Sequence, residues 1–392
     1  MRIGVLCLLL GYVFSQFYRA FLAVLAPFLS ADLGMTADAL ARASGLWFLA
    51  FALTQLPLGW ALDRVGPRRS TAALTLLAAA AAVLFALAPA PWAIVVAMVL
   101  LGIGCAPPLM AAYFLFARVY PPAAFATLGG AMLGLGSLGN LAAAWPMAWA
   151  AETLGWRAAV LGLAAITLAA AAAIWRWVED PPPAPAPEAA GRLTDLIRSP
   201  AMWLIFPLLA VNYAPAAGLR GLWIGPYLQE LHGAGASLIG QATLVMGLAM
   251  VAGSLAYGPL DRRLGRRKAL VLAGNLAGVA CLAALWALPA AGVWSGVLLL
   301  SAVGFFGATF PLLVAHGRNF IPPHLTGRGV TLMNLFAIGG VGVLQLASAR
   351  VHSAAVATGA APEAVYATLF GFFGLALLVG CVVYLFSRER PD

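Results

Sequence analysis

The sequence predicts an all-α membrane protein of twelve transmembrane helices, arranged as two pseudo-symmetric six-helix bundles. Three observations support this fold class: the composition, the length of the apolar runs and an internal duplication. Hydrophobic residues make up 63% of the 392 positions and charged residues only 9%, whereas a soluble chain carries about 25% charged residues. The apolar runs are long and continuous rather than alternating, which favours spanning helices over a β-barrel.

The duplication is clearest in a short charged turn between two apolar runs. The turn around Asp63 returns around Asp261, 198 residues later. The segment Arg118–Pro122 has a counterpart in Arg318–Pro323, 200 residues later. A parallel repeat of this size is typical of membrane proteins built from two halves around one central path.

The apolar runs give the elements in order. Because proline lacks the amide donor that a helix needs, residues 179–200 are predicted to form an extended cytoplasmic linker. This linker separates an N-terminal six-helix half, residues 1–178, from a C-terminal half, residues 201–392. The expected spans lie near residues 3–29, 39–61, 71–89, 92–116, 124–151, 157–178, 201–229, 237–259, 269–289, 293–316, 326–350 and 364–387.

The basic residues predict the orientation, because they gather in the cytoplasmic loops of membrane proteins. With the N-terminus inside, seventeen basic residues fall on the cytoplasmic side and three, Arg42, Arg157 and Arg350, on the other side. These loops account for the net charge of +9, so no nucleic-acid partner is expected. We predict a monomeric, multi-pass protein of the bacterial cytoplasmic (inner) membrane, surrounded by lipid, with both termini cytoplasmic.

The charged turn fits the pattern G-x-x-x-D-R-x-G-R-R. In the first copy, Pro67 is inserted before the last two arginines, and in the second copy Arg263 is an extra residue. The first copy is filled by Gly59, Asp63, Arg64, Gly66, Arg68 and Arg69, and the second by Asp261, Arg262, Gly265 and Arg266.

On these motifs the chain resembles the major facilitator superfamily over essentially its whole length. The resemblance implies a transporter that moves a small-molecule substrate by alternating access. It also implies that Asp63 and its arginines form a conformational latch between the halves, because the amides and dipole of a helix N-terminus stabilise a carboxylate. The alternative is that these charges only fix the topology.

Two arginines fall well inside spans: Arg19 in the first and Arg220 in the seventh, which are equivalent spans of the two halves. A mid-bilayer arginine costs about 2.5–3.5 kcal/mol on insertion scales, and all thirteen acidic residues lie in loops, tails or span ends. Since guanidinium binds carboxylate or phosphate through two oxygens, the pair predicts an anionic substrate. Paired arginines in these spans also resemble the organophosphate-transporting branch of the superfamily. The alternative is that both snorkel or bind backbone carbonyls.

Other polar residues at helical spacing or inside spans are candidates for the same path. Each of them can equally serve as a hydrogen bond between helices. Many proton-coupled carriers use a buried carboxylate as the proton site, whereas this sequence offers only His316, whose pKa can fall in the right range, or the span-end residues Asp32 and Glu230. The sequence therefore favours anion exchange or facilitated flux over proton symport. The remaining substrate-binding candidates are Tyr12, Gln16, Tyr113, Asn140, Tyr213, Trp223, Tyr227, His316 and Asn334.

Three other functions fit parts of the sequence. Met246 and Met250 lie one helical turn apart and offer soft thioether ligands for Cu(I), although methionine is also ordinary filler in apolar helices. Clustered aromatic residues, among them Trp47 and Trp223, suggest uptake of a vitamin-like (riboflavin-like) or aromatic solute. A non-transporting membrane sensor is the alternative from another class. No nucleophile–base pair, metal-ligand cluster or phosphate loop stands out, so no enzyme and no cofactor are expected.

Overall fold

The computed structural model describes residues 2–119, 122–181, 196–321 and 326–389, and these are almost entirely helical, with no strand among them. Within them, ten helices are long and apolar enough to cross a membrane, or eleven if one bent pair counts as a single span. This confirms the all-α membrane fold. The chain forms two compact units, each described separately: unit 1 comprises Met1–Pro185, Ile224–Pro226 and Ala234–Leu244, and unit 2 comprises Ala186–Trp223, Tyr227–Gly233 and Val245–Asp392.

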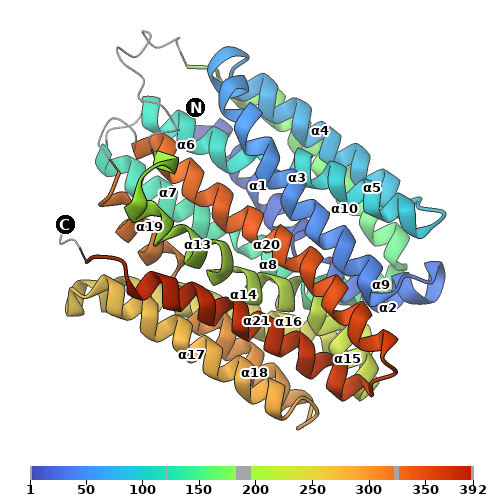
Figure 1. The fold of residues 1–392 in the computed structure, drawn as a ribbon. Coiled ribbons are helices and arrows are strands. Elements are labelled where there is room, and N and C mark those ends of the chain that lie inside the picture. Colours follow the sequence, from blue (N-terminus) through green and yellow to red (C-terminus); the bar gives the residue numbers. More distant parts are fainter. Residues whose placement is uncertain (1, 120–121, 182–195, 322–325, 390–392) are drawn as a thin grey trace. The chain divides into compact units, whose positions relative to one another are not determined.

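Unit 1 is built mainly from the first ten helices (Figure 1). Their ends follow local sequence rules. Thr36 accepts a hydrogen bond from the backbone N–H of Ala39 at 3.3 Å and so caps α3, and Gly34 ends α2 in the left-handed conformation at φ 64°. These helices are α1 (Arg2–Tyr18), α2 (Leu22–Leu33), α3 (Ala37–Arg64), α4 (Pro67–Ala86), α5 (Pro91–Gly104), α6 (Pro107–Val119), α7 (Pro122–Gly136), α8 (Leu138–Ala142), α9 (Trp145–Leu154) and α10 (Trp156–Trp177).

The second half of the chain repeats this pattern with a more broken first span. Among the helices, α15 and α16 contribute their early residues to unit 1 and their later residues to unit 2. The elements are α12 (Pro200–Trp203), α13 (Phe206–Asn212), α14 (Ala214–Gly218), the π-helical turn η1 (Leu219–Trp223), α15 (Ile224–His232), α16 (Ala236–Leu264), α17 (Arg267–Ala287), α18 (Val293–Phe306), α19 (Phe310–Arg318), α20 (Thr326–Ala357) and α21 (Pro362–Leu385).

Several expected spans are interrupted helices. The first bends by 52° between α1 and α2. The span expected at 124–151 is divided among α7, α8 and α9, each too short to count as a span, which explains why fewer than twelve are found. Glycines at 134, 136 and 139 weaken the helix there, and Pro146 cannot supply an amide hydrogen bond. Residues 182–195 of the expected linker lie outside the described residues.

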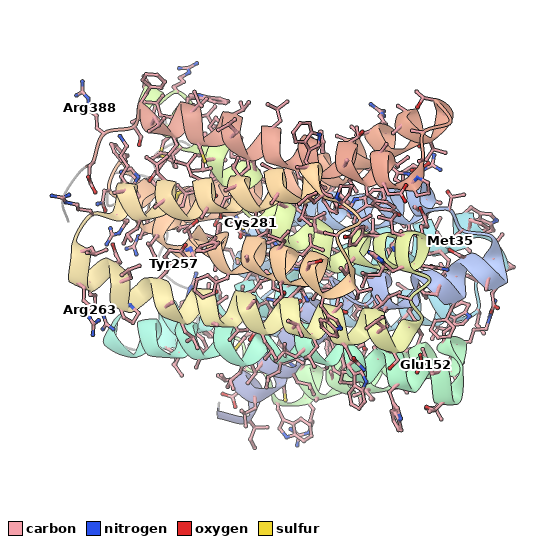
Figure 2. All side chains as sticks on the ribbon, turned by 90° about the horizontal axis from the view of Figure 1, so that it is seen from below. Met35, Glu152, Tyr257, Arg263, Cys281 and Arg388 are labelled. Atoms are coloured by element: carbon pink, nitrogen blue, oxygen red, sulfur yellow. The ribbon has the colours of Figure 1, made fainter. Side chains whose placement is uncertain are left out.

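The regular helices pack against one another within each unit. In unit 1, α4 packs against both α5 and α10, and in unit 2, α17 packs against α18 and α21 (Figure 1). These are corresponding helices of the two halves, so the duplication in the sequence is repeated in the packing. Figure 2 shows Arg263 and Arg388 at the same end of unit 2, which agrees with a clustering of basic residues at one end of each half.

Candidate functional site

Arg19 lies in the turn between α1 and α2, where the first span bends. Its guanidinium carbon is 5.4 Å from the ring centre of Trp47, 5.8 Å from that of Phe48 and 5.1 Å from that of Phe51, all on α3. No ion pair joins Arg19 to any described carboxylate, and its Nε is buried without a hydrogen-bond partner. Each cation–π contact contributes about 0.5–2 kcal/mol, but none supplies an acceptor.

The rings of Trp47, Phe48 and Phe51 pack against one another, and we call these three rings the aromatic floor. Trp47 stacks on Phe51 with ring centres 5.3 Å apart and planes 19° from parallel, and meets Phe48 edge to face at 5.0 Å. All three side chains are buried. The indole Nε1–H of Trp47 also has no hydrogen-bond partner among the described residues, and a buried unsatisfied donor costs about 1–3 kcal/mol.

Three predicted substrate-binding residues of unit 1 form one hydrogen-bonded chain. Gln16 donates from Nε2 to the hydroxyl oxygen of Tyr12 at 2.6 Å, and Asn140 donates from Nδ2 to Gln16 Oε1 at 3.4 Å. The chain joins α1 to α8 inside the unit. Tyr113, on α6, lies against Gly129 of α7.

Arg220 occupies the π-helical turn η1 in the first span of the second half, the element equivalent to the bent first span. Its side chain is only 2% exposed. π-Helical turns inside α-helical segments occur frequently at functional sites. The amide of Gln345, on α20, lies against Gly218 just before this turn and has no hydrogen-bond partner for either of its polar atoms among the described residues.

The aromatic residues beside Arg220 already have structural partners. Trp223 donates from Nε1 to Ser348 Oγ at 3.0 Å, and its ring lies 4.9 Å from that of His352. Tyr227 donates its hydroxyl to the carbonyl oxygen of Pro289 at 2.7 Å. These bonds hold the irregular span against its neighbours. Sequence analysis did not single out Ser348 or His352. They lie one helical turn apart on α20, and no other pattern distinguishes them.

His316 lies among residues that anchor the C-terminal segment. Its Nδ1 is 2.6 Å from the Tyr384 hydroxyl, and its Nε2 is 3.0 Å from the carbonyl oxygen of Arg388. Because a carbonyl only accepts, Nε2 carries the proton and Nδ1 accepts from the tyrosine. Both ring nitrogens are therefore occupied in this state. The other two candidates of unit 2, Tyr213 and Asn334, are half-buried.

In unit 1 the charged turn makes two separate contacts. Asp63 pairs with Arg118 at 3.3 Å, and its side chain is 62% exposed. Asp180, after the last helix of the unit, accepts the backbone N–H of Arg68 at 2.8 Å. The Arg68 Nε–H donates to the carbonyl oxygen of Trp175 at 2.6 Å. The carboxylate at the N-terminus of α4 is thus Asp180, whereas Asp63 lies beside α6.

Gly66 is required at this turn for two reasons. It has φ 94°, which side chains rarely adopt, and a Cβ there would collide with the Asp180 carboxylate. Among the other motif residues, Gly59 has open space where a side chain would lie, and four arginine side chains are exposed. These are Arg64, Arg69, Arg262 and Arg266.

Unit 2 repeats the arrangement with different residues. Lys268 donates from Nζ to the carbonyl oxygens of Leu385 at 2.8 Å and Ser387 at 2.6 Å, and its backbone N–H donates to Glu389 Oε1 at 3.3 Å. Asp261 pairs with Arg267 at 3.0 Å, and Gly265 has φ 60°. In both units a basic residue at the start of one helix holds the end of another, and an acidic residue returns to cap the first. We call this pair of contacts the end clamp.

Met246 and Met250 lie on α16, and the Met250 side chain packs against Gly304 of α18. Met246 is buried at the same contact. Small residues of this kind let helices approach closely in lipid. Among the described residues, no group of three or more His, Cys, Asp or Glu side chains is placed to share a metal ion.

Comparison with known proteins gives one family and several similar folds. The model of the Major Facilitator Superfamily matches residues 8–345. A probable sulfoacetate transporter, SauU, from Cupriavidus necator is 30% identical over 178 residues, a match that spans 43% of this chain and only 39% of that protein.

Solved structures agree on the fold at low sequence identity. The D-xylose-proton symporter superimposes with a TM-score of 0.75 at 13% identity over 98% of this chain and 97% of its own. The nucleoside transporter NupG gives 0.77 at 14% over 99% and 100%. A bacterial homologue of the human lysosomal transporter Spinster, inward-facing and occupied, gives 0.75 at 16% over 99% and 98%.

Proposed function

Because the chain belongs to the Major Facilitator Superfamily and is a multi-pass membrane transporter of a small solute rather than an enzyme, we propose that its solute is a small organic anion, carried by alternating access. The single observation that carries the proposal is the setting of Arg19. A permanently charged guanidinium lies over three rings and has no described carboxylate beside it.

The charge of Arg19 has to be balanced inside the membrane. An intramembrane arginine normally pairs with a carboxylate, a carbonyl or an ion, and a buried charge without such a partner is strongly unfavourable. The aromatic floor offsets part of this cost, but the Arg19 Nε–H still has no acceptor among the described residues. A bound anion supplies both the opposite charge and the acceptor oxygens.

Arg220 supports the same reading from the other unit. It is buried at the irregular turn of the equivalent span, so each half carries one arginine at a break in its first span. Such breaks expose backbone groups that must be satisfied by protein, water or ligand. We infer that Arg220, like Arg19, contacts the anion during the transport cycle.

The chemistry of the partial relative narrows the solute. SauU is named as a probable sulfoacetate transporter, and it matches 43% of this chain. We propose a small sulfonate or carboxylate as the solute. Both ring nitrogens of His316 already have hydrogen-bond partners, so we propose that the solute moves by exchange or facilitated flux rather than by proton symport. We also propose the bacterial cytoplasmic membrane, with both termini inside, and a monomeric carrier.

The test is ligand binding followed by uptake. Purified protein is screened by thermal shift against sulfoacetate, malonate, phosphate, xylose, riboflavin and Cu(I), since a true ligand stabilises the folded state by mass action. The anions that bind are then followed into proteoliposomes. We expect stabilisation by an organic anion and not by xylose or riboflavin.

Matched variants identify the anion site. Arg19→Gln and Arg220→Gln remove one guanidinium each, while Arg42→Gln removes an exposed one. We expect the first two to abolish anion uptake with insertion intact and the third to leave uptake unchanged. Unchanged uptake kinetics in both Arg19→Gln and Arg220→Gln would refute the anion proposal.

A further inference from the structure

Trp47 presents a donor that the fold leaves unused. The side chain is 1% exposed, and no described residue accepts its indole N–H. Buried tryptophan usually finds an acceptor for this group. The ring cannot turn to find one, because it is stacked on Phe51 and held against Phe48. The packing therefore fixes this N–H at a position where the described part of the chain provides no partner.

The neighbouring arginine presents a second unused donor. Arg19 Nε is also buried and lacks a partner, and the guanidinium carbon lies 5.4 Å from the centre of the Trp47 ring. The two side chains are direct neighbours, so an anionic group bound next to both can place one oxygen about 2.9 Å from each donor nitrogen. Two adjacent buried donors with no acceptor are complementary to an oxyanion.

The number of donors distinguishes between classes of oxyanion. A guanidinium binds two oxygens side by side, which satisfies a carboxylate completely. A sulfonate or phosphonate group has a third oxygen in a different plane, and that oxygen needs a donor of its own. The Trp47 N–H is a donor on a separate side chain next to Arg19, so it can serve an oxygen that the guanidinium does not bind.

We propose that the Trp47 indole N–H donates to the third oxygen of a tetrahedral anionic group held by Arg19, and that Trp47 thereby selects sulfonate-type cargo over carboxylates. This inference rests on the proposed function, since it requires Arg19 to bind an anion. It goes further by naming the geometry of the anionic group and the residue that recognises it.

The experiment compares the binding of two ligands to protein with and without the Trp47 indole N–H. Sulfoacetate and malonate differ in a single position, where sulfonate replaces carboxylate. Trp47→Phe removes the N–H and keeps an aromatic ring over Arg19. We expect this variant to lose about tenfold in sulfoacetate affinity, the size of one hydrogen bond to a charged group, and to change malonate affinity by less than about twofold. Trp92→Phe, at a tryptophan that is 64% exposed, should change neither.

A direct measurement covers the case in which Trp47→Phe is poorly folded. Protein labelled with ¹⁵N in the tryptophan indole gives one N–H resonance per tryptophan, and the Trp47 resonance is identified by its absence from the variant or by elimination with the other tryptophan variants. Sulfoacetate should move this resonance to lower field, and malonate should not. A Trp47 resonance that ignores saturating sulfoacetate overturns the inference.

The outcomes separate this inference from the proposed function. If Arg19→Gln abolishes uptake of both anions while Trp47→Phe discriminates them as the wild type does, the Trp47 role is wrong and the anion site stands. Equal losses for both ligands in Trp47→Phe also overturn it, because they indicate a packing role. If neither anion binds the wild type, the inference fails; if Arg19→Gln also leaves transport of the true solute unchanged, the proposed function fails with it.

Discussion

Removing the Asp180 carboxylate should destabilise unit 1 more than removing the Asp63 carboxylate, although only Asp63 belongs to the sequence motif. Asp180 accepts the Arg68 backbone N–H at 2.8 Å at the first turn of α4. A side-chain cap of this kind contributes about 1 kcal/mol, and a negative charge at a helix N-terminus adds about 0.3–1 kcal/mol, less at an exposed position. The expected loss for Asp180→Ala is therefore about 1–2 kcal/mol.

The Asp63 contact is weaker by geometry and exposure. It is a single 3.3 Å contact with Arg118, and its carboxylate is 62% exposed, so solvent and salt screen it. Exposed pairs of this kind contribute about 0–1 kcal/mol, and Asp63→Ala should lie at the low end of that range. Asp180→Asn should fall between the wild type and Asp180→Ala, because the amide oxygen still accepts the hydrogen bond but the charge is lost.

The assay is thermal unfolding of the purified protein in detergent, at low salt and at about 1 M salt, where the Debye length falls to about 3 Å. Asp180→Ala should lower the midpoint by a few degrees at both salt concentrations, whereas the deficit of Asp180→Asn should shrink at high salt. If Asp63→Ala lowers the midpoint as much as Asp180→Ala does, the assignment of the cap to Asp180 is wrong.

Two further variants test separate parts of the structure. Asp63→Asn should leave the unfolding midpoint nearly unchanged but slow turnover more than it weakens binding; a large loss of equilibrium affinity with normal turnover would contradict the predicted latch. Tyr384→Phe leaves His316 Nδ1 without its partner at a site that is 1% exposed, and should cost about 1–3 kcal/mol in unfolding experiments without altering the pH dependence of uptake; an altered pH profile would point to His316 as a proton site.

The fold was predictable because it depends on properties that are local in sequence. Run length and composition decide whether a segment can span a bilayer, and the repeated turn indicates the two halves. The breaks within the spanning helices were harder to predict from the sequence. Glycine and proline are frequent in membrane helices, so the sequence does not tell that 124–151 divides into α7, α8 and α9 while α16 runs unbroken through Pro259. Packing against neighbouring helices decides between a break and a tolerated proline.

The candidate site was partly predictable for the same reason. Tyr12 and Gln16 are four residues apart on a helix, and that spacing brings their side chains into hydrogen-bond contact at 2.6 Å. The next link, from Gln16 to Asn140, spans 124 residues and depends on how α1 meets α8. The end clamps were not predictable from the motif, because Asp180 and Glu389 lie outside it and contact it only in the folded unit.

Each unit contains one end clamp and one irregular first span, which carries Arg19 in unit 1 and Arg220 in unit 2. A clamp joins the start of α4 to the end of α10 and the residues after it in unit 1, and the start of α17 to the end of α21 and the residues after it in unit 2, through short hydrogen bonds. The first span of each half is instead broken or π-helical at its arginine. Intramembrane charge and irregular backbone are both costly, and here the two costs fall in the same segments. On the proposed function, a bound anion offsets the cost of the charge, and its binding free energy acts on the first span of each half, where the backbone is irregular.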